Sequence, residues 1–80
     1  MKARVIVTLK NGVLDPQGQA IEGSLASLGF AGVSGVRQGK VFDLEVPGTD
    51  EDAARSQIKE MCEKLLANTV IENYAIEISH

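Results

Sequence analysis

Alternating apolar and polar residues near the start of the chain predict a first strand. From Lys2 to Leu9 one face is uniformly apolar, and the other is polar except for Ile6. Because side chains alternate between the two faces of a strand, the apolar face should point toward the core. It consists of Ala3, Val5, Val7 and Leu9. Asn11-Gly12 then marks a turn.

A helix with unusually small side chains should follow. Asp15 is placed to act as its N-cap, and Pro16 suits the first helical position, where a missing N–H costs nothing. Gly29 can close the helix in a left-handed cap. Two interior glycines, Gly18 and Gly23, cost about 1 kcal/mol each relative to alanine. We infer that something approaches this helix closely, either the sheet of the same chain or a second protein. The apolar stripe of the helix consists of Ile21, Leu25 and Leu28.

The segment 33–46 fits two predictions. In the first, Gln38-Gly39 is a two-residue turn and the segment is a hairpin. Gln-Gly is a weaker turn signal than Asn-Gly, and this hairpin sets Arg37 opposite Lys40. In the second, the segment is one long strand bent at Gly39, which would overrun its own sheet and could pair with another subunit. We favour the hairpin by a small margin.

The clearest helix runs from Thr49 to about Ala67. Thr49 is a natural N-cap, and the acidic first turn lies at the positive end of the helix dipole. Asn68 could supply a left-handed stop. The alternation from Val70 to Ile78 predicts a final strand. The apolar face of this helix consists of Ala54, Ile58, Met61, Cys62, Leu65 and Leu66.

This order of elements predicts an α+β fold. Two helices on one face of a three- to four-stranded antiparallel sheet would bury every apolar stripe, and the ferredoxin-like βαββαβ arrangement is the usual solution. Residues 1–80 should form a single domain. The opposite sheet face is half apolar, with no helix left to cover it. We predict that this face, or the sheet edges, packs against another copy.

Composition and charge argue against several classes of function. The net charge of −3 and the three aromatic residues disfavour nucleic-acid binding. The single cysteine, Cys62, indicates a reducing, cytoplasmic setting, and neither a signal peptide nor a membrane span is expected. Because Cys62 lies among core-facing residues and the only histidine is the terminal His80, we expect no catalytic residue and no metal site.

Two features remain open to a functional interpretation. Arg37 and Lys40 flank Gly39 without an acidic neighbour in sequence. They are explained about equally well as solvated turn charges and as an anion or partner contact. The small-residue helix behind Asp15-Pro16 is explained better by tight packing on its own sheet than by a partner surface.

Three runs of sequence resemble one protein family. They are GVLDPQG at 12–18 with LGF at 28–30, VRQGK at 36–40, and EMCEKLLANTVIENY at 60–74. In order and spacing they resemble PurS, the small subunit of phosphoribosylformylglycinamidine synthase, over nearly the whole chain.

The resemblance implies a place in a complex with a large synthetase subunit and a glutaminase subunit. That complex converts formylglycinamide ribonucleotide (FGAR), glutamine and ATP to formylglycinamidine ribonucleotide (FGAM) in de novo purine biosynthesis. The large subunit uses the ATP and magnesium, so this chain is expected to bind no cofactor and to be no enzyme by itself. As a homodimer or tetramer in the cytoplasm, it would join the other subunits and aid ammonia transfer, with no nucleic-acid or membrane partner.

Partner contacts are expected at the charged or backbone-shaping positions inside these runs. They are Asp15, Pro16, Gln17, Gly18, Arg37, Gly39 and Lys40. The alternative hypothesis is a ferredoxin-like regulatory domain that binds a small metabolite.

Overall fold

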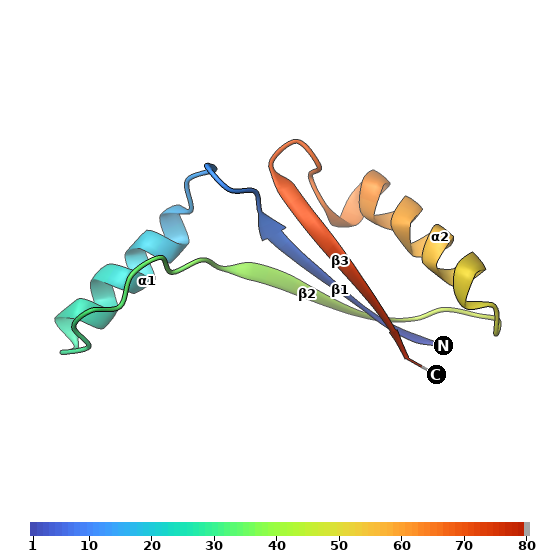
Figure 1. The fold of residues 1–80 in the computed structure, drawn as a ribbon, viewed down its shortest axis with the longest axis horizontal. Helices are drawn as coiled ribbons and strands as arrows, with labels where there is room; N and C mark the ends of the chain where they lie inside the picture. The colour runs from blue at the N-terminus through green and yellow to red at the C-terminus, as the bar shows by residue number, and fades with distance from the viewer. Residues whose placement is uncertain (80) are drawn as a thin grey trace.

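A computed structural model describes residues 1–79 as an antiparallel sheet with two helices (Figure 1). The elements are β1 (Lys2–Leu9), α1 (Pro16–Ser27), β2 (Gly39–Glu45), α2 (Glu51–Met61), a π-helical turn (Cys62–Leu66) and β3 (Glu72–Ser79). No helix in this range is long and apolar enough to cross a lipid bilayer. His80, which the sequence excludes as a catalytic base, lies outside the described residues.

The sheet has the strand order β2-β1-β3, and both pairings are antiparallel. Val5 in the central strand lies opposite Phe42 on one side and Ile76 on the other, so apolar side chains form rows across the core face. The predicted α+β class and antiparallel sheet are confirmed, and β1 has the predicted bounds.

The core lies between the sheet and α2. Ile58 and Cys62 from the second helical segment are fully buried against Val5 and Val7. The residues of the predicted apolar face of this helix are buried or partly buried, with one exception: Leu65 is 83% exposed. In the π-helical turn, the N–H of Ala67 bonds to the carbonyl of Cys62, five residues back. This wider turn rotates Leu65 away from the stripe that the α-helical period predicts.

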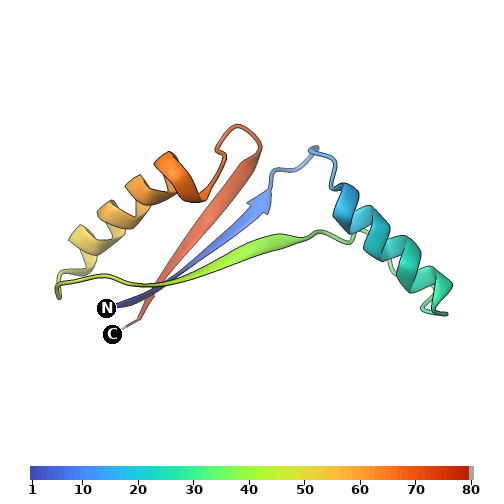
Figure 2. The ribbon, with the colours of Figure 1, turned by 180° about the vertical axis from the view of Figure 1, so that it is seen from behind.

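α1 does not lie on the sheet of its own chain, which corrects the prediction that both helices share one face. Figures 1 and 2 show α1 standing off the end of the sheet, while α2 runs beside β3. Leu28 of the predicted stripe is 72% exposed. The radius of gyration of 16.1 Å exceeds the roughly 12 Å of a compact chain of this length.

The hairpin prediction for 33–46 is wrong, and so is a single strand over that whole range. Only Gly39–Glu45 is a strand, so the sheet has three strands and not the four of βαββαβ. The backbone N–H of Gln38 donates to the Asp15 carboxylate, and the Arg37 guanidinium donates to the carbonyl of Lys10. These bonds hold residues 37–38 beside the start of α1, and Gly39 already pairs with Thr8 of β1, so Gln38-Gly39 is not the turn of a hairpin.

The ends of the helices agree with the sequence in part. α1 ends as predicted, because Gly29 has a φ of 95° and the N–H of Phe30 bonds to the carbonyl of Leu25. The N-cap of α2 is Asp50 and not Thr49. Asn68 does not have a positive φ. Its carbonyl and side chain instead accept hydrogen bonds in a turn, so β3 begins at Glu72 and not at the predicted Val70.

Candidate functional site at the corner

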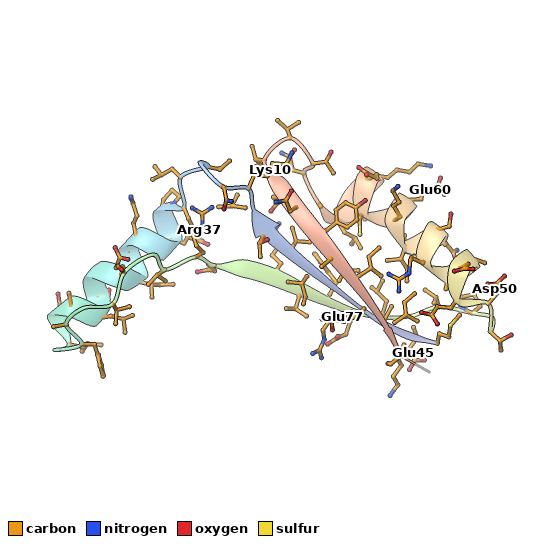
Figure 3. The ribbon with its side chains drawn as sticks, viewed as in Figure 1. Lys10, Arg37, Glu45, Asp50, Glu60 and Glu77 are labelled. Carbon is orange, nitrogen blue, oxygen red and sulfur yellow. The ribbon has the colours of Figure 1, made fainter. Side chains whose placement is uncertain are left out.

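The predicted contact residues gather where β1 ends, α1 begins and β2 begins. We call this region the corner, and Figure 3 shows Lys10 and Arg37 there. A pocket of about 380 Å³ lies in it. Its lining consists of Val7, Leu9, Asp15, Pro16, Gln17, Gln38, Gly39, Lys40 and Glu72. Of the other two predicted residues, Gly18 bonds to Asp15 and Arg37 precedes Gln38 in the chain. The corner therefore unites all seven.

The Asp15 carboxylate is the buried centre of the corner. One oxygen, Oδ1, accepts the N–H of Gly18 at 2.8 Å, which caps α1 as the sequence predicts. The other, Oδ2, accepts the N–H of Gln38 at 2.8 Å, a contact that the sequence analysis missed. Only 6% of Asp15 is exposed. One side chain thus ties the beginning of α1 to the segment that returns to the sheet.

These two hydrogen bonds lower the pKa of Asp15 below its ordinary value of 3.8. The N–H of Gln38 has the largest effect and the N–H of Gly18 the next, because both stabilise the ionised form. Burial opposes this shift, and the positive charge of Arg37 supports it. Asp15 is therefore ionised at neutral pH.

Acid should reduce the contribution of the Asp15 hydrogen bonds to the stability of the chain. Since the folded pKa of Asp15 lies below the unfolded one, its contribution to stability is present at neutral pH and is lost as the pH falls through the folded value. We expect the free energy of unfolding to fall less steeply in acid for Asp15→Asn than for the wild type. Urea unfolding, followed from neutral pH to below pH 3.8, measures this difference. Equal slopes for the two proteins would contradict the assignment.

Gly18 explains the close approach that the sequence indicates. A β-carbon at this position would collide with the backbone carbonyl oxygen of Val36. At Gly23 a β-carbon would meet nothing within 4 Å. The first glycine of α1 is therefore required by its own chain, whereas the second faces open space in the single chain.

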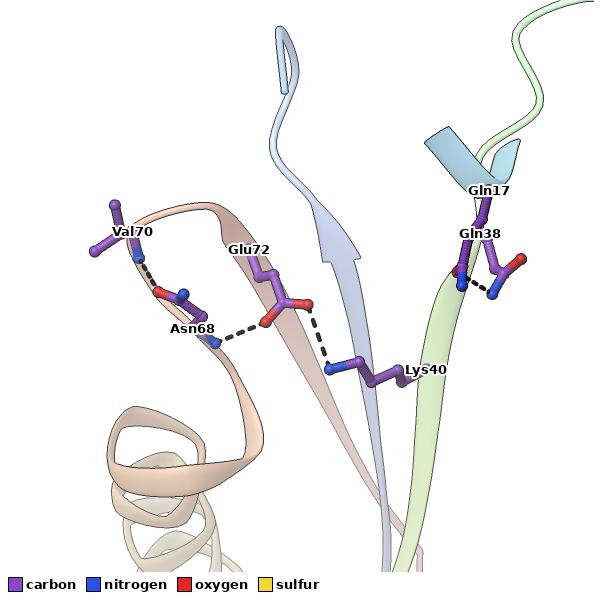
Figure 4. A network of polar contacts seen from close by, with 6 residues as sticks. All are labelled: Gln17, Gln38, Lys40, Asn68, Val70 and Glu72. Carbon is purple, nitrogen blue, oxygen red and sulfur yellow. Dashed lines mark hydrogen bonds and ion pairs between the residues drawn. The ribbon is translucent and has the colours of Figure 1, made fainter. Parts of the chain in front are cut away.

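A polar network surrounds the pocket (Figure 4). Gln38 Nε2 donates to Gln17 Oε1 at 2.7 Å, and Lys40 Nζ lies 3.6 Å from Glu72 Oε2. The other Glu72 oxygen accepts the N–H of Asn68 at 2.7 Å. Sequence reasoning missed Gln38 and Glu72, although both lie within the resembling runs, because it assigned the first to a turn and had no pairing signal for the second.

The corner presents charged and polar groups that suit binding. Among residues 1–79, no group of three histidine, cysteine or acidic side chains could hold a metal ion. The Cys62 thiol lies in the core, where burial raises its pKa and keeps it protonated. The exposed side chains of Arg37 and Lys40 can contact an acidic or carbonyl-rich surface.

A larger hollow of about 690 Å³ lies at the opposite end of the sheet, near Glu45 and Glu77 (Figure 3). The Arg4–Asp43 ion pair, 2.8 Å long, belongs to its lining. None of the seven predicted contact residues lies there. We therefore take the smaller pocket at the corner as the candidate site.

The chain matches one family model over residues 2–80, that of "PurS: Phosphoribosylformylglycinamidine (FGAM) synthase". It is 51% identical to the phosphoribosylformylglycinamidine synthase subunit PurS of Synechocystis sp., over 95% of this chain and 76% of that protein. Among solved structures it is similar to Bacillus subtilis PurS, with a TM-score of 0.89 and 48% identity over 99% and 98% of the two chains. A chain of the PurLQS structure from Thermotoga maritima matches with a TM-score of 0.86 and 34% identity, over 95% of this chain and 93% of that one.

Proposed function

Because the chain belongs to the PurS family of FGAM synthase subunits, we propose that it joins the glutaminase and synthetase subunits of that complex and aids ammonia transfer between them. It is a non-catalytic subunit of a cytoplasmic complex that converts FGAR, glutamine and ATP to FGAM. The large subunit uses the ATP and magnesium, and this chain binds no cofactor. The match over nearly the full chain carries this proposal and supports it over a metabolite-binding domain.

A homo-oligomer, dimer or tetramer, is the second part of the proposal. The single chain exposes 5638 Å², against about 4,700 Å² for a compact protein of its mass. The surplus is close to the roughly 800 Å² that one partner contributes to a standard interface. The apolar stripe of α1 is the exposed surface that another copy would cover, since Leu28 has no neighbour on its own sheet.

The corner is the surface that we assign to the partner subunits. Asp15, Pro16, Gln17, Gly18 and Gly39 shape its backbone, and two exposed cations, Arg37 and Lys40, provide its charge. Lys40 has only a partial partner, because its side chain remains 61% exposed beside Glu72. Such a basic rim fits an acidic patch on a glutaminase or synthetase subunit.

Reversing both corner charges should separate the chain from its complex. We expect Arg37→Glu/Lys40→Glu to lower glutamine-dependent FGAM formation at least about tenfold, because like charges across an interface cost several kcal/mol. Activity with added ammonia, which bypasses the glutaminase, should change much less. The measurements are glutamine- and ammonia-dependent activity with purified partner subunits, and co-elution of the complex.

A matched control carries the same charge change elsewhere. Lys59→Glu/Lys64→Glu places two reversals at exposed lysines of α2 and the π-helical turn, neither of which lines the corner pocket. We expect this variant to keep both activities and an intact complex. Full glutamine-dependent activity and normal co-elution of the corner variant would refute the contact assignment.

A further inference from the structure

Two segments connect the sheet to α1, and they lie side by side. Residues 10–15 lead out from β1, and residues 36–39 lead back into β2. Between them, residues 16–35 project from the sheet as an arm that consists of α1 and the loop after it, and residues 36–39 are its return segment (Figures 1 and 2). Arg37 Nη2 donates to the carbonyl of Lys10 at 3.1 Å, which links the two connecting segments, and Gln38 bonds to Gln17 in the first turn of α1. Both bonds are exposed.

Asp15 links the same segments in a different way. Its two oxygens accept N–H groups from both sides of the junction, Gly18 in α1 and Gln38 in the return segment. The carboxylate is buried, whereas the two other links are open to water. Charge-assisted hydrogen bonds are about twice as strong as neutral ones, and shielding from water preserves that strength.

An N-cap needs only one oxygen, so capping leaves the second bond of Asp15 unexplained. That bond joins Asp15 to Gln38, which are 23 residues apart in sequence, at the point where the arm meets the sheet. Next to it, the carbonyl of Val36 packs against Gly18, so the two segments touch directly. A tie at the base of a projecting arm controls the angle at which the whole arm leaves the sheet.

We propose that Asp15 is a positioning residue that fixes the direction of the arm relative to the sheet. It thereby presents the apolar stripe of α1 to a second copy in one orientation, a consequence that rests on the proposed homo-oligomer. The direction of the arm itself is a property of the single chain.

Two variants separate capping from positioning. Serine and asparagine are N-caps as good as aspartate, so Asp15→Ser and Asp15→Asn should keep α1 helical. Serine is too short to bridge to Gln38. Asparagine has one acceptor oxygen, so its NH₂ group would face one of the two N–H donors. Asp15→Ser therefore keeps the cap and loses the tie, and Asp15→Asn keeps only one of the two bonds.

The test measures the direction of the arm in the full chain. Nitroxide labels at Ser27→Cys in α1 and Asn73→Cys in β3 report the distance between arm and sheet by pulsed electron paramagnetic resonance. An excess of unlabelled chain restricts the signal to distances within one chain. Cys62 is buried, so the chain without added cysteines serves as the labelling blank.

We expect one narrow distance distribution for the wild type and one at least about twice as wide for Asp15→Ser and Asp15→Asn, with unchanged helical circular dichroism. If only about a tenth of the arms then keep the competent direction, homo-association weakens about tenfold for each arm that the interface uses. The matched control is Asp50→Ser, because Asp50 caps α2 through Asp52 and Ala53 of its own helix alone. Its distribution should equal that of the wild type.

Distributions for Asp15→Ser and Asp15→Asn as narrow as that of the wild type would overturn the positioning role. So would an equal widening in Asp50→Ser, because the effect would then belong to any lost cap. The distance measurement needs no partner subunit. A wild-type chain that fails to associate would therefore contradict the proposed homo-oligomer. It would not contradict the role of Asp15 in fixing the direction of the arm.

Discussion

Gly18→Ala should destabilise the chain by about 3 kcal/mol, near the upper end of the cost of an overpacked core. The new β-carbon would collide with the carbonyl oxygen of Val36, and it would lie about 3 Å from the Asp15 carboxyl carbon. The first obstacle is backbone, which cannot rotate away as the end of a flexible side chain can. For a domain of this size, the melting temperature should fall by about 10–20 °C.

Gly23→Ala is the matched control, because it makes the same change in the same helix. Apart from the adjoining backbone of α1 itself, nothing lies within 4 Å of the new β-carbon, so alanine should stabilise α1 by about 0.5–1 kcal/mol. Thermal and urea unfolding of both variants at one protein concentration measure the difference. Equal stability of Gly18→Ala and the wild type would show that the return segment does not pack against α1 as the structure has it.

Leu28→Asp/Phe30→Asp should convert the proposed homo-oligomer to monomer. Both side chains are more than half exposed on the arm, where the single chain offers no cover for them. If they lie at the centre of an interface, each charged replacement costs at least about 2 kcal/mol, and together they weaken association about a thousandfold. Sedimentation velocity over a range of concentrations measures the loss.

Leu65→Asp is the control for this prediction. Leu65 is even more exposed, at 83%, but it belongs to the π-helical turn and not to the arm. We expect its oligomeric state to equal that of the wild type. Unchanged association of the arm variant would contradict the assignment of the α1 stripe to a second copy. Dissociation by Leu65→Asp would move the interface to the π-helical turn.

Local features of the fold were predictable where one or two neighbouring residues decide them. The bounds of β1 follow from the alternation that only Ile6 interrupts, and both ends of α1 follow from Asp15 and Gly29. Family resemblance added the seven residues that the structure brings together at the corner. Their joint location could not be read from spacing alone, because Asp15 and Gln38 meet only through the path of the intervening arm.

The predictions that were wrong are those in which the sequence allows two local structures. Contacts or backbone geometry elsewhere in the chain then select one of them. The sequence of Gln38-Gly39 is compatible with a hairpin turn. In the structure, however, the N–H of Gln38 donates to the distant Asp15 carboxylate. Thr49 and Asp50 are both good N-caps, and the backbone geometry selects the second. Leu65 fits the α-helical stripe, but the π-helical turn rotates it outward.

The sequence by itself determined the α+β class, the core face of β1, the start and end of α1, and membership of the family. It did so because hydrophobic period, capping residues and motif order act over short spans. Only the tertiary structure decided where α1 lies. An apolar stripe indicates that a helix packs against another surface, but it does not indicate whether that surface belongs to the same chain or to another one. We propose that the Asp15 tie directs α1 away from its own sheet. The same stripe that predicts a buried helix is therefore exposed in the single chain, where we propose that another copy covers it.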